Sequence, residues 1–278
     1  MLFHPQWSLL CCYLSCQHYK LSLDNQLVVV KTSKSKYLAV IDVEKEFITN
    51  EGKFSFSIIK NIPSKVHSST GVEFKIYHPT YKEFVLLMKR GPQIIYPKDI
   101  GQIILEADIH KDSNVLEIGT GSGALTLYLL NILGTAGSLI SLDVSRKNQR
   151  RAKKTIDRYM STNEFKNNYN LDFITTSLVD FNYLEYTEVV DTVVTDVPEP
   201  WEFFENNIVT KDLKWVSYLP SISQITKFND VLINNKFENI EVKEVILRDW
   251  VVDKKIVRPS NKLVSHTGFI ISGRYIKY

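Results

Sequence analysis

The segment Glu117-Ile118-Gly119-Thr120-Gly121-Ser122-Gly123 decides the fold of this 278-residue chain. The apolar run at residues 115–118 predicts a strand, and residues 123–133 predict a helix. Glycines between a strand and a helix permit a tight turn and let a ligand approach the backbone closely. The free N–H groups at the start of the following helix favour a polar or anionic ligand. The segment therefore predicts the ligand-binding turn of an α/β sheet.

Strands and helices alternate outward from this turn. The predicted strands are residues 138–142, 171–176, 191–195 and 213–218, and the predicted helices are residues 99–107, 146–160 and 222–234. Two last strands, residues 240–247 and 268–275, have no long helix between them, which favours an antiparallel edge pair. Strand–helix alternation predicts a Rossmann-like, doubly wound α/β sheet with helices on both faces.

The N-terminal part of the chain has a different pattern. Four short apolar runs, at residues 27–30, 37–41, 54–58 and 74–77, are separated by polar turns, and no helix is expected before about residue 80. We therefore expect a small β-rich domain at residues 21–90 and the sheet domain at residues 91–278. Residues 1–20 are interpreted as an extension.

Composition limits the class of protein. Hydrophobic residues make up 44% and charged residues 23%, so the chain can bury a core, and the formal net charge of +3 is only mildly basic. All three cysteines lie at Cys11, Cys12 and Cys16, which favours a reducing, cytoplasmic location and neither a disulfide framework nor a zinc site. The apolar stretch at residues 2–14 is too short to span a bilayer. We expect no metal and no membrane association.

An acidic residue accompanies the glycine turn. Asp143 follows the next predicted strand, twenty residues after Gly123, where a carboxylate can accept both ribose hydroxyls of a nucleoside cofactor. The spacing alone is compatible with a nicotinamide cofactor, since Ala124 is tolerated in the relaxed dinucleotide pattern. Glu117 before the Gly-x-Gly-x-Gly turn, however, is similar to the first motif of class I methyltransferases.

A second candidate site is Asp196-Val197-Pro198-Glu199-Pro200-Trp201, after the fourth strand of the alternating region. Ligands of open α/β sheets bind beyond the carboxyl ends of the strands, so Asp196 and the glycine turn should face one crevice. The two prolines stiffen the loop, and Trp201 offers a flat apolar wall. A purely structural reading, with Asp196 as a helix cap, is the alternative.

The predicted helix at residues 146–160 is strongly basic. It carries Arg146, Lys147, Arg150, Arg151, Lys153, Lys154 and Arg158 against the single acid Asp157. Such a run is often a solvated helix face. Its single sign of charge also makes Arg146, Lys147, Arg150, Arg151 and Lys154 candidates for binding RNA phosphates.

From about residue 21 to the end, the chain resembles the tRNA (adenine-N1)-methyltransferase family. The resemblance is carried, in order, by Gln93-Ile94-Ile95-Tyr96-Pro97-Lys98-Asp99, residues 117–126, residues 196–201, Ser217-Tyr218-Leu219-Pro220 with Gln224, Arg248-Asp249-Trp250, Arg258-Pro259 and His266-Thr267-Gly268-Phe269. Each segment alone is weak evidence for the family, but the order and spacing of all the segments together are specific to it.

The resemblance implies methyl transfer from S-adenosylmethionine to N1 of a T-loop adenine in tRNA, at position 58 with its neighbour as a further candidate, by a homotetramer. It implies a catalytic Asp196 and an adenine pocket lined by Tyr96, Tyr218, His266 and Trp201. It implies cofactor contacts from Gln93, Ile94, Glu117, Gly119, Thr120, Gly121, Ser122, Gly123, Ala124, Thr126, Asp143, Ser177 and Leu178.

The chain departs from the family pattern at two positions. Asp143 stands where the family usually has Glu, and Ser177-Leu178 stands where an Asp usually meets the cofactor adenine. Ser177 can still hydrogen-bond to an adenine amino group. The alternatives are a non-catalytic tRNA-binding subunit, or a methyltransferase of the same fold with another substrate. An N6-adenine methyltransferase is disfavoured because its Asp-Pro-Pro-Tyr type of motif is absent.

Overall fold

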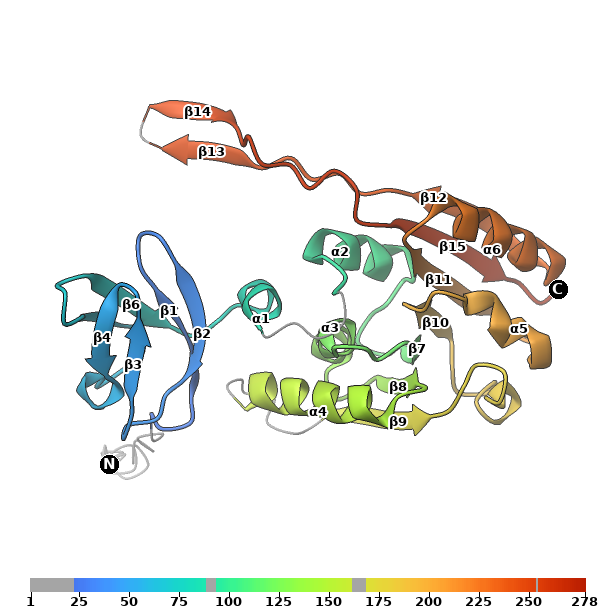
Figure 1. Cartoon of the computed structure of the whole chain (residues 1–278). Coiled ribbons are helices and arrows are strands. Elements are labelled where there is room, and N and C mark those ends of the chain that lie inside the picture. Colours follow the sequence, from blue (N-terminus) through green and yellow to red (C-terminus); the bar gives the residue numbers. More distant parts are fainter. Residues whose placement is uncertain (1–22, 89–93, 162–168, 254) are drawn as a thin grey trace, which may run out of the picture. The chain divides into compact units, whose positions relative to one another are not determined.

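The computed structural model describes residues 23–88, 94–161, 169–253 and 255–278. The chain divides into two compact units between His78 and Pro79. Each unit has its own sheet (Figure 1) and its own cluster of buried apolar side chains. The predicted domain limits at residues 20 and 90 stay predictions.

The first unit is an antiparallel β structure. Its four-stranded sheet has the order β2-β1-β6-β5, formed by Lys36–Val40, Leu27–Lys31, Glu73–Tyr77 and Ser64–His67. The strands β3 (Glu46–Thr49) and β4 (Gly52–Ser55) form a separate hairpin. The apolar side chains between them include Val28, Val30, Phe54 and Phe74. The predicted strand at residues 54–58 is wrong in its second half, because Phe56–Ile58 forms a 3-10 helix that Ser55 caps through its side chain.

The second unit contains the predicted α/β sheet, with seven strands in the order β12-β15-β11-β10-β7-β8-β9. The parallel strands are β11 (Leu213–Leu219), β10 (Thr192–Thr195), β7 (Asn114–Ile118), β8 (Ser138–Asp143) and β9 (Asn170–Thr175). The edge strands are β12 (Phe237–Lys243) and β15 (Phe269–Tyr275), and β15 runs antiparallel to both of its neighbours. The predicted fold class is confirmed.

The α-helices of the described residues lie in the second unit. They are α1 (Tyr81–Leu87), α2 (Pro97–Glu106), α3 (Ala124–Leu133), α4 (Arg146–Met160), α5 (Phe203–Asn206) and α6 (Ile222–Asn234). Of these, α2, α3, α4 and α6 pack against the sheet of that unit. Figure 1 shows α2 and α6 on either side of β15. Helix α6 buries Ile225, Phe228 and Leu232 in the core cluster that also holds Trp215. The helix α1 was not predicted, although Thr80 and Glu83 form a capping box of the kind that marks a helix start.

A hairpin of β13 (Trp250–Asp253) and β14 (Ile256–Pro259) extends beyond the ends of β12 and β15 (Figure 1). The sequence pattern did not indicate it and predicted that the preceding strand would reach residue 247, whereas β12 ends at Lys243. Large apolar side chains along this segment are exposed, including Ile246, Trp250, Val252 and Val257. We call residues 246–253 and 255–264 the hairpin arm.

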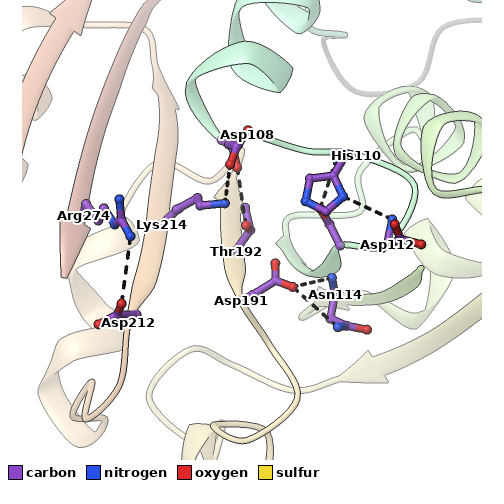
Figure 2. A network of polar contacts seen from close by, with 11 residues as sticks. Asp108, His110, Asp112, Asn114, Asp191, Thr192, Asp212, Lys214 and Arg274 are labelled. Carbon is purple, nitrogen blue, oxygen red and sulfur yellow. Dashed lines mark hydrogen bonds and ion pairs between the residues drawn. The ribbon is translucent and has the colours of Figure 1, made fainter. Parts of the chain in front are cut away.

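Polar contacts tie the amino ends of the central strands together (Figure 2). The backbone N–H of Asn114 donates to the Asp191 carboxylate at 2.9 Å, and Lys214 Nζ lies 2.7 Å from Asp108 Oδ2. Asn114, Asp191 and Lys214 lie at or next to the first residues of β7, β10 and β11, so the network is at the edge of the sheet opposite the carboxyl ends of the strands.

Candidate active site

The glycine turn follows β7 and leads into α3, as the sequence predicted. Gly119 has a φ of 104°, and a side chain there would overlap the backbone carbonyl oxygen of Asp196. Gly123 has a φ of 79°, and a Cβ atom would lie 2.7 Å from the Cβ of Ala152 in α4. A left-handed backbone and a close neighbour both require glycine at these two positions. The turn is therefore packed against the Asp196 loop on one side and α4 on the other.

Buried polar side chains hold the glycine turn to the sheet. The Glu117 carboxylate accepts hydrogen bonds from Thr126 at 2.7 Å and from Ser141 at 2.6 Å, and Thr120 bonds Ser141 at 2.6 Å. Glu117 is fully buried, and this loss of hydration raises its pKa to about 8, although the two hydrogen bonds act in the opposite direction. Glu117 thus supports the turn from inside the sheet.

Asp143 ends β8 beside the turn. One carboxylate oxygen accepts the Gly121 N–H at 2.9 Å, and the other accepts the Ser145 N–H at 2.7 Å. The amide of Asn148 lies 3.4 Å from both oxygens. The carboxylate is therefore held in one orientation, with the turn and the first residues of α4 arranged around it.

These elements enclose a first cavity of about 250 Å³ at the carboxyl ends of the strands. It is lined by Ile118, Gly119, Gly121, Leu142, Asp143, Val144, Asn148, Thr176, Leu178, Asp196 and Val197. Apolar walls with a few convergent polar groups are typical of nucleoside sites. Asn148, Thr176 and Val144 were not predicted from the sequence, and Val197 was predicted only as part of the second candidate site. Asn148 could have been noticed, because it lies in the first turn of the helix after Asp143.

Of the other predicted cofactor residues, Ile94 does not line this cavity but a second one that also borders Asp196. Leu178 lines the first cavity, whereas Ser177 does not, because its hydroxyl donates to Asp180 at 2.6 Å and closes a local turn. Thr120, Ser122, Ala124 and Thr126 are buried in the glycine turn and the first turn of α3. Gln93 lies outside the described residues.

Asp196 lies after β10 and borders two cavities. Its backbone N–H donates to the Ile118 carbonyl at 2.8 Å, which fixes it beside the glycine turn. No side chain in the described ranges hydrogen-bonds its carboxylate, and burial raises its pKa to about 7. Gln224 of α6 donates to the Pro198 carbonyl at 2.8 Å and holds the proline loop that follows. The carboxylate is therefore positioned and still has its acceptor capacity.

The second cavity, of about 190 Å³, lies on the other side of Asp196. Its lining is Ile94, Ile95, Asp196, Val197, Pro198, Tyr218, Pro220 and Thr267. Tyr218 is the next-to-last residue of β11 and is almost completely buried, which raises its pKa to about 12. A narrow, mostly apolar space beside an aromatic ring and a carboxylate fits a flat heterocycle with polar edges.

Three predicted pocket residues do not line this cavity. Tyr96 is the N-cap residue of α2, directly after Ile94 and Ile95. Lys227 Nζ lies over the Trp201 ring, 3.9 Å from its centroid. His266 bonds Glu244 at 2.6 Å and the Pro220 carbonyl at 3.2 Å, and these contacts raise its pKa. Ile95, Pro220 and Thr267 were missed, because an apolar or small residue gives no chemical signal in a sequence.

Helix α4 presents the predicted basic face. Arg146, Lys147, Arg150, Arg151 and Lys154 are exposed, and none of them forms an ion pair with a described residue. A surface hollow is lined by Lys147, Arg150, Arg151 and Lys154. Of the basic residues on this helix, Lys153 pairs with Asp157 at 3.2 Å. The other cations are available to an anionic partner.

The described residues offer neither a membrane span nor a metal cluster. None of the helices there is long and apolar enough to cross a membrane. No group of three or more histidine, cysteine, aspartate or glutamate side chains is placed to hold a metal ion in the part of the chain that the structure describes. Cys11, Cys12 and Cys16 lie outside that part.

Known proteins resemble this chain over most of its length. The family model of the tRNA methyltransferase complex GCD14 subunit matches residues 74–267. TrmI of Methanocaldococcus jannaschii, a tRNA (adenine(57)-N(1)/adenine(58)-N(1))-methyltransferase, is 32% identical over 92% of this chain and 94% of its own length. TrmI of Thermus thermophilus, a tRNA (adenine(58)-N(1))-methyltransferase, is 29% identical over 75% of this chain and 80% of its own.

Solved structures agree with the sequence relatives. The tRNA (m1A58) methyltransferase TrmI from Aquifex aeolicus superposes with a TM-score of 0.74 at 26% identity, covering 92% of this chain and 98% of that one. A SAM-dependent O-methyltransferase from Thermotoga maritima gives a TM-score of 0.80 at 20% identity, covering 91% and 94%, and at that identity it supports the fold alone. With this fold and the family match, the chain belongs to the GCD14 family of tRNA methyltransferase subunits and has the fold of S-adenosylmethionine-dependent methyltransferases.

Proposed function

We propose that this chain transfers a methyl group from S-adenosylmethionine to N1 of an adenine in the T-loop of tRNA, at position 58 with its neighbour as a further candidate. The observation that carries the proposal is the position of Asp196. This residue lines both the cavity beside the glycine turn and the cavity beside Tyr218. A donor in one cavity and an acceptor in the other would meet at this carboxylate. The relatives from Methanocaldococcus jannaschii and Thermus thermophilus carry this activity in their names.

The first cavity fits the cofactor. Gly119 and Gly121 leave room for a ligand against the backbone, and Asp143 lines the same space with a carboxylate suited to ribose hydroxyls. Leu142, Val144 and Leu178 supply apolar walls for the adenine ring. Bound there, the cofactor supplies an activated sulfonium methyl group, so the protein's task is alignment and not activation.

The second cavity fits the target base. Extracting a base from its stacking partners costs a few kcal/mol, and stacking on an aromatic ring returns about 1–3 kcal/mol per base. Tyr218 lines the cavity and can offer such a ring, and Asp196 can accept hydrogen bonds from the exocyclic amino group. Methylation of N1 leaves a positive charge on the purine. An ionised Asp196 stabilises that charge as it develops.

We assign the phosphate contacts to helix α4. Five of its exposed cations have no described carboxylate partner, so binding a phosphate to them does not require breaking an existing ion pair; they are Arg146, Lys147, Arg150, Arg151 and Lys154. Lys147, Arg150, Arg151 and Lys154 border one hollow, which brings their charges together. Neutralisation of phosphates by several cations gives affinity that is independent of base sequence and falls with salt.

We further propose that the enzyme is a homotetramer that acts in the cytoplasm, where its substrate tRNA is found. The support for self-association is the hairpin arm, whose exposed apolar side chains are Ile246, Leu247, Trp250, Val252, Ile256, Val257, Leu263 and Val264. Exposed large apolar side chains gathered in one segment favour an interaction site. In a homo-oligomer, the surface that covers these side chains belongs to a second copy of the chain.

Nucleoside mapping tests the proposed function. Purified protein is incubated with labelled S-adenosylmethionine and unmodified tRNA transcripts, the tRNA is digested, and the methylated nucleosides are identified and located. We expect 1-methyladenosine at T-loop positions and none in a transcript whose T-loop adenines are replaced. Binding of S-adenosylmethionine without any 1-methyladenosine would reject the proposal and favour a non-catalytic tRNA-binding subunit. Methylation of another nucleoside would show the same fold acting on a different substrate.

A further inference from the structure

A buried ion pair lies at the start of helix α2, behind the second cavity. The Lys98 side chain is 8% exposed and Asp99 is fully buried, with Nζ 2.7 Å from Asp99 Oδ1. Lys98 also donates to the Val245 carbonyl at 2.6 Å and to the Thr267 hydroxyl at 2.7 Å. Thr267 in turn donates to the other Asp99 oxygen at 2.7 Å. Three segments far apart in sequence therefore meet at one closed set of hydrogen bonds.

The network ends at the cavity. Thr267 is a lining residue, and the next residue, Gly268, lies against the phenol end of Tyr218. A Cβ atom at position 268 would lie 2.7 Å from the Tyr218 hydroxyl oxygen, so only glycine leaves the ring in place. Lys98 and Asp99 thus anchor the segment that supports the Tyr218 ring from behind, and they do so without contact with the cavity themselves.

Stability alone is a weak explanation for this pair. Removing two charges from water costs about as much as their attraction returns, so a buried ion pair is often no better than apolar residues of the same size. What such a pair does supply is a fixed geometry, because each partner must be satisfied by defined neighbours. Here the fixed neighbours are the backbone at Val245 and the hydroxyl of Thr267.

The network also determines what Thr267 offers to a ligand. A threonine hydroxyl has one proton, and here that proton is donated to Asp99, while an oxygen lone pair accepts from Lys98. The hydroxyl is therefore not available as a donor to a bound base. Asp196 remains as the cavity's charged acceptor, which suits a heterocycle that presents an amino group.

We propose that Lys98 and Asp99 are positioning residues for the target base: through Thr267 and Gly268 they hold the Tyr218 ring and keep the cavity selective for an amino-bearing purine edge. The inference rests on the proposed function and adds to it a role for residues that touch neither cofactor nor base. It predicts that disturbing the network affects the methyl-transfer step and leaves the binding of cofactor and tRNA unchanged.

The test compares four variants of the full chain. Thr267→Val removes the hydroxyl at constant shape and leaves the 2.7 Å Lys98–Asp99 pair intact, so it stays informative if Lys98→Met does not fold. Thr267→Ser restores the hydroxyl. The control is Lys214→Met, which removes a more exposed lysine–aspartate pair of the same 2.7 Å length at the other end of β11 (Figure 2). Single-turnover methylation, tRNA binding by filter retention and S-adenosylmethionine binding by calorimetry are measured for each.

We expect Lys98→Met and Thr267→Val to lower the single-turnover rate by about 10- to 100-fold, the range expected for a base displaced by a fraction of an ångström. Both binding constants should stay within about two-fold of the wild type, Thr267→Ser should recover most of the rate that Thr267→Val loses, and Lys214→Met should react like the wild type. Wild-type rates in both network variants, or equal losses in cofactor binding and rate, would overturn the inference. A wild-type protein that forms no 1-methyladenosine would instead reject the proposed function, and the inference with it.

Discussion

Replacing Asp196 with Asn should make the protein more stable at alkaline pH while it removes activity. The pKa of Asp196 is raised from 3.8 to about 7 because the folded protein withdraws the carboxyl group from water. The unfolded chain releases this proton near the ordinary pKa, and the folded chain keeps it until about pH 7. The contribution of Asp196 to stability is therefore fully present below the unfolded pKa and is lost as the pH rises through the folded pKa.

The size of the effect follows from these two pKa values. Each pH unit between them costs about 1.4 kcal/mol, so the full loss above pH 7 is at most about 4 kcal/mol. Between about pH 5.5 and about pH 8.5 the wild type should lose roughly 2 kcal/mol that an Asn variant retains. For a protein of this size that is a shift of about 4–8 °C in melting temperature, and the remaining solvent contact of Asp196 makes it an upper value.

The assay is thermal or urea unfolding of both proteins at the two pH values, without ligand. Glu117, whose pKa is also raised, is present in both proteins, so its titration largely cancels in the comparison. Methyl transfer by the Asn variant should fall about 10²- to 10³-fold, the usual cost of losing one preorganised electrostatic contact. A stability difference that does not change with pH would refute the reasoning, because it would mean that Asp196 is as well hydrated in the folded chain as in the unfolded one.

Three further outcomes are expected. Gly119→Ala should abolish S-adenosylmethionine binding in calorimetry, because its Cβ would overlap the Asp196 carbonyl at a φ of 104°, whereas Gly101→Ala, where a Cβ meets nothing within 4 Å, should bind normally. A second variant replaces four α4 cations with Ala, namely Lys147, Arg150, Arg151 and Lys154. It should bind tRNA more weakly, and the slope of log affinity against log salt concentration should become shallower by about 0.9 for each phosphate that is no longer neutralised. Cofactor binding should be unchanged. Charged residues in the hairpin arm, as in Trp250→Glu with Val252→Glu, should reduce the mass measured by light scattering, and an unchanged mass would exclude the arm as the interface.

The elements of the sheet were largely predictable because their local signals agree with their tertiary roles. Helices α4 and α6 begin and end at the predicted residues, since Ser145 and Ser221 cap them and their apolar faces are periodic. The hairpin β13–β14 was not predictable, because its apolar side chains face solvent in the single chain and show no buried face. The 3-10 helix at Phe56–Ile58 was also missed, because an alternating apolar run predicts a strand equally well.

The site was predictable where the chemistry depends on backbone geometry or charge. Gly119 and Asp196 follow adjacent parallel strands, and the carboxyl ends of such strands meet at one edge of the sheet. The contribution of Thr267 was not predictable, because it depends on contacts with Lys98 and Asp99, nearly 170 positions away in sequence. Trp201 and His266 have the residue types expected of a pocket. In the structure, however, the Trp201 ring contacts Lys227 and the His266 ring hydrogen-bonds to Glu244.

Because Asp196 borders both cavities, its charge affects which product leaves the enzyme first. In the proposed transfer, the positive charge passes from sulfur on one side of Asp196 to a purine on the other, and the counter-charge does not move. The spent cofactor, a neutral thioether, is then held less firmly, while the modified nucleotide is held more firmly than the one that entered. Departure of the tRNA, rather than of the used cofactor, is therefore expected to limit turnover, and mild salt should accelerate it.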